Sequence, residues 1–175
     1  MATLIQPESS PPKSRAPLEL PGTFSSSQAE DTFTLGKRLA PLLEKGSIVA
    51  LNGPLGAGKT CFIKGVAVGL GVEEEVTSPT YTIVSEYEGS LLGKTIPVYH
   101  IDAYRLRGTD DFSAIGGEEM IFGDGISLVE WSENINDFIP PEALRVDIEI
   151  SANGDNKRLL RIYRGEKGAD MEDCK

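Results

Sequence analysis

One segment constrains the fold of this 175-residue chain more than any other. Residues 53–60, GPLGAGKT, fit the pattern G-x-x-x-x-G-K-[ST] of a phosphate-binding loop. The apolar run at 47–52 predicts a short buried strand before the loop, and apolar residues at helical spacing predict a helix over 60–70 after it. A phosphate-binding loop needs this order of strand, loop and helix. The segment therefore predicts an α/β domain with a site for a nucleoside triphosphate.

The residue types of this loop suit a triphosphate. Glycine has no Cβ, so the backbone can curl until several N–H groups converge on phosphate oxygens at a helix N-terminus. Lys59 would reach the β and γ phosphates, and the Thr60 hydroxyl would lie near the Mg²⁺ that bridges them. A glycine-rich turn with a chance Lys-Thr pair is the alternative. The predicted nucleotide-binding residues are Gly53, Gly56, Ala57, Gly58, Lys59, Thr60 and Cys61.

Length and composition narrow the class of protein. A chain of this length with 39% hydrophobic residues predicts one globular domain. Its formal net charge of -10 argues against a surface that grips nucleic acid and favours a protein partner. Cys61 and Cys174 form neither a disulfide framework nor a metal-ligand spacing, which fits the reducing cytoplasm. Without an apolar run of about 18 to 20 residues, no membrane contact is expected.

The predicted domain lies between two polar ends. Residues 1–22 are rich in proline and lack a periodic apolar pattern, so they predict a disordered tail. The alternative for this segment is an organelle transit peptide. Such peptides are poor in acidic residues, so Glu8 and Glu19 argue against it. The folded domain is placed at 23–165, and a polar C-terminal tail at 166–175.

Further elements complete a mixed sheet. A possible capping box at Ser27 and Glu30 predicts a helix that runs toward Gly46 and kinks or ends at Pro41. A short helix is expected at 110–121. The remaining predicted strands are residues 80–88, 95–104, 125–131, 144–150 and 158–163. These elements predict a three-layer α/β domain of the P-loop NTPase type, with a mixed central sheet and an antiparallel C-terminal hairpin.

Two carboxylates follow apolar strands and could serve the triphosphate. Asp102 follows residues 96–101, and Glu130 follows residues 126–129. A phosphate-binding loop needs a neighbouring acidic group to hold Mg²⁺ or to orient the attacking nucleophile. Both side chains would emerge beside the loop if their strands run parallel to the first one. Spacing does not assign their roles, and a solvated strand-end carboxylate is the alternative for each.

Three other residues are weaker candidates. Thr80, in the Thr-Ser-Pro-Thr segment at 77–80, is either part of a nucleotide-sensing switch loop or part of a turn with a proline. Trp131, which follows the second carboxylate, is either a stacking or partner-contact residue or a half-buried core residue. His100 faces the same side of its strand as Asp102, and a packed strand histidine is favoured over a catalytic base.

The sequence also bears on the nucleotide and the reaction. The nearest match to the guanine-binding motif N-K-x-D, at residues 156–159, lacks the aspartate, so ATP is favoured. A small kinase needs a lid with several arginines, whereas the basic residues here are scattered. Hydrolysis or switching is therefore favoured over phosphoryl transfer to a small molecule. Two alternatives stay open: a nucleotide-sensing regulatory module without turnover, and a small P-loop kinase.

Four segments together resemble the TsaE (YjeE-like) family: GPLGAGKT, TSPTYTIVSEY, VYHIDAYRL and GDGISLVEW, within about residues 25–150. The resemblance implies a bacterial cytoplasmic ATPase required to make threonylcarbamoyladenosine at position 37 of tRNAs that read codons beginning with A. It also implies that the chain acts with two partner proteins, TsaB and TsaD. ATP binding would set how well the chain fits the TsaB–TsaD pair, and ATP hydrolysis would reset the complex between rounds. Because TsaD modifies the adenosine, contact with tRNA would be only indirect.

The resemblance also implies roles for individual residues. Thr60 and Glu130 would hold Mg²⁺, Asp102 would act in hydrolysis, and Thr80 would be the threonine of the switch loop. Three residues depart from the family pattern without removing a ligand: Pro54, Cys61 and Ser132. The thiol beside the helix N-terminus, that of Cys61, is expected to have a lowered pKa.

Overall fold

A computed structural model describes residues 18–153 and 156–165, and its sheet has seven strands in the order β1-β7-β6-β2-β5-β4-β3. The strands are β1 Gly22–Ser26, β2 Ile48–Asn52, β3 Val84–Leu91, β4 Lys94–Asp102, β5 Ile126–Glu130, β6 Leu144–Ile150 and β7 Arg158–Arg164. The α-helices are α1 Ala29–Leu39, α2 Lys59–Gly69, α3 Thr109–Ala114 and α4 Gly117–Phe122. Short 3-10 helices are η2 Ala40–Leu42, η3 Ala103–Arg105 and η4 Ser132–Phe138.

The sheet is parallel at its centre and antiparallel at both edges. Strand β2 runs parallel to β5 and β6, and β4 runs parallel to β5. At one edge β3 is antiparallel to β4, and at the other β7 is antiparallel to β6 and to β1. This arrangement confirms the predicted mixed sheet and the C-terminal hairpin. The carboxyl ends of β2, β4 and β5 therefore meet at one edge of the sheet.

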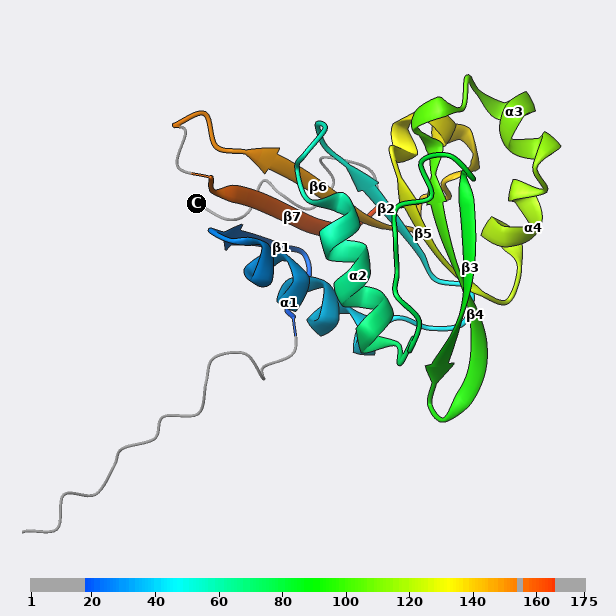
Figure 1. Cartoon of the computed structure of the whole chain (residues 1–175), viewed down its shortest axis with the longest axis horizontal. Helices are drawn as coiled ribbons and strands as arrows, with labels where there is room; N and C mark the ends of the chain where they lie inside the picture. The colour runs from blue at the N-terminus through cyan, green and yellow to red at the C-terminus, as the bar shows by residue number, and fades with distance from the viewer. Residues whose placement is uncertain (1–17, 154–155, 166–175) are drawn as a thin grey trace, which may run out of the picture.

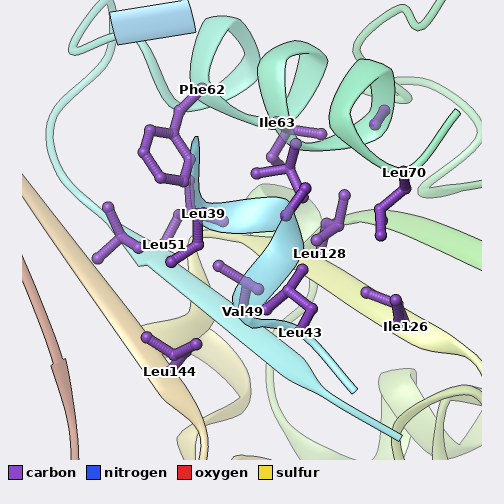
Figure 2. Close-up of a cluster of buried hydrophobic side chains, with 14 of the residues drawn as sticks. Leu39, Leu43, Val49, Leu51, Phe62, Ile63, Leu70, Ile126, Leu128 and Leu144 are labelled. Atoms are coloured by element: carbon purple, nitrogen blue, oxygen red, sulfur yellow. The ribbon is translucent and has the colours of Figure 1, made fainter. Parts of the chain in front are cut away.

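Two hydrophobic cores cover opposite faces of this sheet. Side chains alternate along a strand, so Val49 and Leu51 of β2 join one core while Ile48 and Ala50 join the other. Helices α1 and α2 cover the first face, and Figure 2 shows Phe62 and other side chains of α2 above the sheet. Residues of α3, α4 and η4 cover the second core. The domain thus has the three predicted layers (Figure 1).

Helices α1 and α2 touch at two glycines. A Cβ on Gly36 would lie 2.1 Å from the carbonyl oxygen of Phe62, and a Cβ on Gly65 would lie 2.0 Å from that of Phe33. Neither contact leaves room for a side chain, so the two backbones pack directly against each other. Because α2 begins where the predicted phosphate-binding loop ends, this contact with α1 fixes the position of the loop.

The N-terminal part of the domain differs from its prediction. Residues 1–17 lie outside the described residues, but Leu18 is only 5% exposed and β1 begins at Gly22. Leu18 and Gly22 therefore belong to the folded domain, which begins earlier than the predicted residue 23. Strand β1 was not predicted because Phe24 is its only large apolar residue.

Several element boundaries also differ. Helix α1 is capped by Gln28 and Asp31, one residue after the predicted capping box, and it ends before Pro41 as expected. The strand predicted from residue 80 starts at Val84, because Ile83 donates its N–H to the carbonyl of Pro79 in a turn. The single helix predicted at 110–121 is two helices, separated where Gly116 adopts φ 73°.

No helix in the described part of the chain is both long and apolar enough to cross a membrane.

Candidate functional site

The loop between β2 and α2 has the backbone that a phosphate-binding loop requires. Gly53, Gly56 and Gly58 have φ values of 146°, 76° and 108°, which residues other than glycine rarely adopt. Gly58 is the N-cap of α2, and the helix starts at Lys59. The loop thus turns directly into a helix N-terminus, where backbone N–H groups and the helix dipole favour an anion.

The side chain of Lys59, the first residue of α2, is buried against the loop. Its Nζ donates to the carbonyls of Gly53, at 2.7 Å, and Pro54, at 3.1 Å. The same ammonium lies 3.7 Å from the centroid of the Trp131 ring. Burial lowers the pKa of Lys59, and the carboxylates of Glu130, Glu133 and Asp102 oppose that shift. A buried cation held by neutral carbonyls and a ring is suited to receive a phosphate group.

Thr60 and Glu130 connect the loop to the end of β5. The Thr60 hydroxyl donates to Oε1 of Glu130 over 2.7 Å, so it keeps its lone pairs for a further ligand. A hydroxyl and a carboxylate supply the hard oxygens that Mg²⁺ prefers, so these residues fit the predicted metal. No cluster of three or more His, Cys, Asp or Glu among the described residues could hold a metal. Phosphate and water oxygens would therefore have to complete the coordination of Mg²⁺.

Asp102 ends β4 beside Glu130 of β5, with which it is paired in the sheet register. Its Oδ1 accepts from the backbone N–H of Tyr104 at 3.1 Å, and its Oδ2 accepts from the Ser78 hydroxyl at 3.3 Å. The Ser78 hydroxyl is also 2.8 Å from that of Thr80. A chain of hydrogen bonds therefore joins the predicted switch segment to the strand-end carboxylate.

These residues line one hollow of about 310 Å³. Its lining comes from the loop, the segment at 77–80 and the ends of β4 and β5. The lining residues are Leu55, Gly56, Ala57, Gly58, Lys59, Thr60, Ser78, Thr80, Asp102, Tyr104, Glu130 and Trp131. The structure thus brings together both carboxylates, the loop residues from Gly56 to Thr60, Thr80 and Trp131, which are far apart in the sequence.

Cys61 lies apart from this group. Its Sγ is 3.2 Å from the carbonyl oxygen of Ala29 in the segment that begins α1, and it does not line the hollow. Burial raises the pKa of this thiol, so the prediction of a lowered pKa is wrong. The effect of desolvation exceeds that of the positive charge on Lys64, which acts in the opposite direction.

Three residues of the hollow were not predicted: Leu55, Ser78 and Tyr104. Tyr104 carried a usable signal, because it lies only two residues beyond the carboxylate that ends β4. Ser78 had a similar signal, since it belongs to the same Thr-Ser-Pro-Thr segment as Thr80. Leu55 carried none, because an apolar residue at a variable loop position does not reveal which way it points.

The sequence matches a family of known proteins over most of its length. The family model described as "Threonylcarbamoyl adenosine biosynthesis protein TsaE" matches residues 26–160. The chain belongs to the TsaE family. It is 42% identical over 132 residues to the TsaE protein of Treponema pallidum, a match that covers 75% of this chain and 94% of that protein. It is 41% identical over 131 residues to TsaE of Bacillus subtilis, covering 75% and 78% of the two chains.

A solved structure supports the same assignment. The crystal structure of YdiB from Bacillus subtilis superimposes with a TM-score of 0.68 at 33% sequence identity. The superposition covers 82% of this chain and 85% of that one. The predicted α/β fold is therefore confirmed, and so is the family that the four sequence segments indicated.

Proposed function

We propose that this TsaE-family chain binds ATP with Mg²⁺ in the hollow and hydrolyses it during the synthesis of threonylcarbamoyladenosine on tRNA. The contact of 2.7 Å between Thr60 and Glu130 carries the proposal. It joins the loop that would hold the phosphates to the carboxylate that would hold the metal. Bound Mg²⁺ would neutralise charge on the β and γ phosphates, with Thr60 and Glu130 as its protein ligands.

Asp102 is the residue proposed to act on the attacking water. It is buried and lines the same hollow as the loop, so its carboxylate can accept a hydrogen bond from a water near the γ phosphate. The donors that already hold it, the Tyr104 N–H and the Ser78 hydroxyl, fix its orientation. Lys59 would leave its loop carbonyls and place its charge on the transferred phosphoryl group.

Exposed side chains in and beside the hollow, here called the rim, supply a surface for a protein partner. Leu55 and Tyr104 line the hollow and are 83% and 56% exposed, and Tyr81, which follows the lining residue Thr80, is 86% exposed. Large apolar side chains this exposed around a nucleotide site suit docking that depends on the bound nucleotide. We assign this rim to the TsaB–TsaD pair in the cytoplasm, with tRNA contacted only indirectly, consistent with the charge of -10.

In this proposal the bound nucleotide controls when the chain associates with TsaB–TsaD. ATP would change how tightly the rim binds the pair, because Thr80 and Ser78 link the segment beside the rim to Asp102. Hydrolysis would remove the γ phosphate and so release the partner between rounds of modification. The product would be threonylcarbamoyladenosine at position 37 of tRNAs that read codons beginning with A.

Mg²⁺-dependent hydrolysis of ATP by the purified chain, alone and with TsaB–TsaD, tests the ATPase proposal. We expect turnover that Lys59→Ala and Glu130→Ala abolish, and that Lys45→Ala leaves intact. Lys45 is the matched control because it pairs with Asp124 on the surface, outside the hollow. ATP binding without turnover above the two variants would instead identify a nucleotide sensor, and phosphoryl transfer to an added acceptor would identify a kinase.

A second experiment tests the docking surface. We expect Tyr81→Ala and Leu55→Ser each to weaken the ATP-dependent association with TsaB–TsaD by roughly tenfold or more, as for exposed anchors of an interface. Leu92→Ser is the control, since Leu92 is 97% exposed but lies in the turn between β3 and β4. If all three variants bind TsaB–TsaD as tightly as the wild type does, the interface lies on another face.

A further inference from the structure

His100 has no role in the proposed function. It lies in β4, two residues before Asp102, and its side chain is 0% exposed. Its Nε2 is 2.9 Å from Oε1 of Glu130. A fully buried polar ring that contacts a carboxylate of the proposed metal site is more than core packing, because an apolar side chain would fill the same space without desolvating two nitrogens.

The contact has a defined direction. An ionised carboxylate can only accept hydrogen bonds, so Nε2 must carry the proton that it donates to Glu130. The other ring nitrogen, Nδ1, is buried and has no hydrogen-bond partner among the described residues. A proton on Nδ1 would therefore be a buried donor without an acceptor. The surroundings favour the tautomer in which Nε2 donates.

Glu130 is thus held from two sides. Its Oε1 accepts from Nε2 of His100 and from the hydroxyl of Thr60, at 2.9 Å and 2.7 Å. The imidazole comes from β4, the strand next to β5, where the backbone of His100 is paired with that of Leu128, and its full burial leaves the ring little room to rotate. Of the two donors, the histidine is therefore the fixed one, and the threonine belongs to the loop that receives the nucleotide.

We propose that His100 is a positioning residue that sets the magnesium affinity of the site by fixing the carboxylate of Glu130. This inference rests on the proposed function, since it requires that Glu130 and Thr60 hold the metal. With the carboxylate fixed, the Thr60 hydroxyl donates its proton to Glu130, and its lone pairs would be available to the metal. Without His100, Glu130 can rotate, and Thr60 loses the acceptor that orients it.

A matched pair of variants tests the role of the donor. His100→Gln places an amide N–H at the same number of bonds from Cα as Nε2, whereas His100→Met has a similar unbranched shape and no donor. The measurement is the affinity for ATP, by calorimetry, over a series of Mg²⁺ concentrations and in excess EDTA. We expect His100→Met to raise the half-saturating Mg²⁺ concentration roughly 10- to 100-fold and His100→Gln to stay within about threefold of the wild type.

Several outcomes separate this inference from the proposed function. ATP binding in EDTA should be the same in all three proteins, because His100 does not line the hollow. Equal Mg²⁺ requirements of the Gln and Met variants would overturn the positioning role. If the affinity of the wild type for ATP does not depend on Mg²⁺, the metal site itself is wrong, and with it both proposals.

If His100→Met does not fold, His100→Asn replaces it, since the shorter amide cannot reach Glu130 and should also raise the Mg²⁺ requirement.

A double-mutant cycle distinguishes positioning from a general structural defect. In the Glu130→Ala background no side-chain oxygen is left at this position for His100 to hold, so His100→Met should change the Mg²⁺ requirement by less than about threefold. A full 10-fold or larger effect in that background would overturn the inference, because His100 would then act independently of Glu130.

Discussion

The ammonium group of Lys59 lies over the indole ring of Trp131, 3.7 Å from its centroid. Trp131 is the only tryptophan of the chain, so tryptophan fluorescence reports on the surroundings of this one ring, which include Lys59 and the ring of Tyr104. If the lysine moves to the phosphates when ATP binds, the charge above the ring moves with it. We therefore expect ATP to change the intensity or wavelength of the intrinsic emission, with a midpoint equal to the Kd from calorimetry.

The fluorescence prediction has a simple control. Trp131→Phe should abolish the signal but still bind ATP, with an affinity lowered by at most about 30-fold, because a cation over an aromatic ring contributes on the order of 0.5 to 2 kcal/mol. Wild-type emission that stays constant while calorimetry reports saturation would mean that Lys59 remains over the ring in the bound state.

Asp102→Asn should separate chemistry from binding. The amide has the shape of the carboxylate but cannot take a proton from water, so we expect kcat to fall by roughly 100-fold or more. The affinity for ATP should change by less than about threefold, because the phosphate contacts come from the loop. Single-turnover hydrolysis and calorimetry measure the two quantities. Asp110→Asn, an exposed residue in α3, is the control. An unchanged kcat would make Asp102 a structural carboxylate.

The fold could be predicted where the sequence pattern is local. The loop at 53–60 and the apolar runs of β2 and β5 are recognisable because a buried parallel strand is apolar on both faces. Strand β1 was missed because it is defined by pairing with β7, far away in the sequence, rather than by its own side chains. The split between α3 and α4 was missed for a related reason, since the positive φ of Gly116 depends on packing.

The candidate site shows the same division. Asp102 and Glu130 were placed beside the loop because the ends of parallel strands meet at one edge of the sheet. The bond between His100 and Glu130 was not predicted, because it depends on which strand lies next to β4. The pKa of Cys61 was predicted in the wrong direction, because a sequence shows the nearby helix N-terminus but not the burial that outweighs it.

Gly65→Ala should lower stability even though alanine is the better helix former. Propensity alone favours alanine by roughly 0.5 to 1 kcal/mol. The added Cβ would lie 2.0 Å from the Phe33 carbonyl oxygen, so α1 and α2 must separate. We expect a net loss of about 1 to 3 kcal/mol, or a Tm lower by roughly 2 to 12 °C. Val68→Ala, at an exposed position of α2, is the control for thermal unfolding. A raised Tm would show that the helices can separate at no cost.

Tyr163 should make stability depend on alkaline pH. Burial raises its pKa to about 12, helped by the charge of Asp147 and by the hydrogen bond of 3.0 Å that its hydroxyl donates to that carboxylate. In the unfolded chain the phenol loses its proton near pH 10. Between about pH 10 and 12 the folded protein therefore keeps a proton that the unfolded chain has lost, and stability falls as pH rises.

Urea unfolding of the wild type and of Tyr163→Phe measures this effect. Below pH 10 the variant should be less stable by about 1 to 3 kcal/mol, because Asp147 is buried and loses a donor. As pH rises from about 10 to 12, only the wild type loses the contribution of this phenol, so the difference between the two proteins should shrink. Tyr81→Phe, which alters an exposed phenol, should run parallel to the wild type. A constant difference between wild type and Tyr163→Phe across that range would show that the Tyr163 hydroxyl ionises equally in both states.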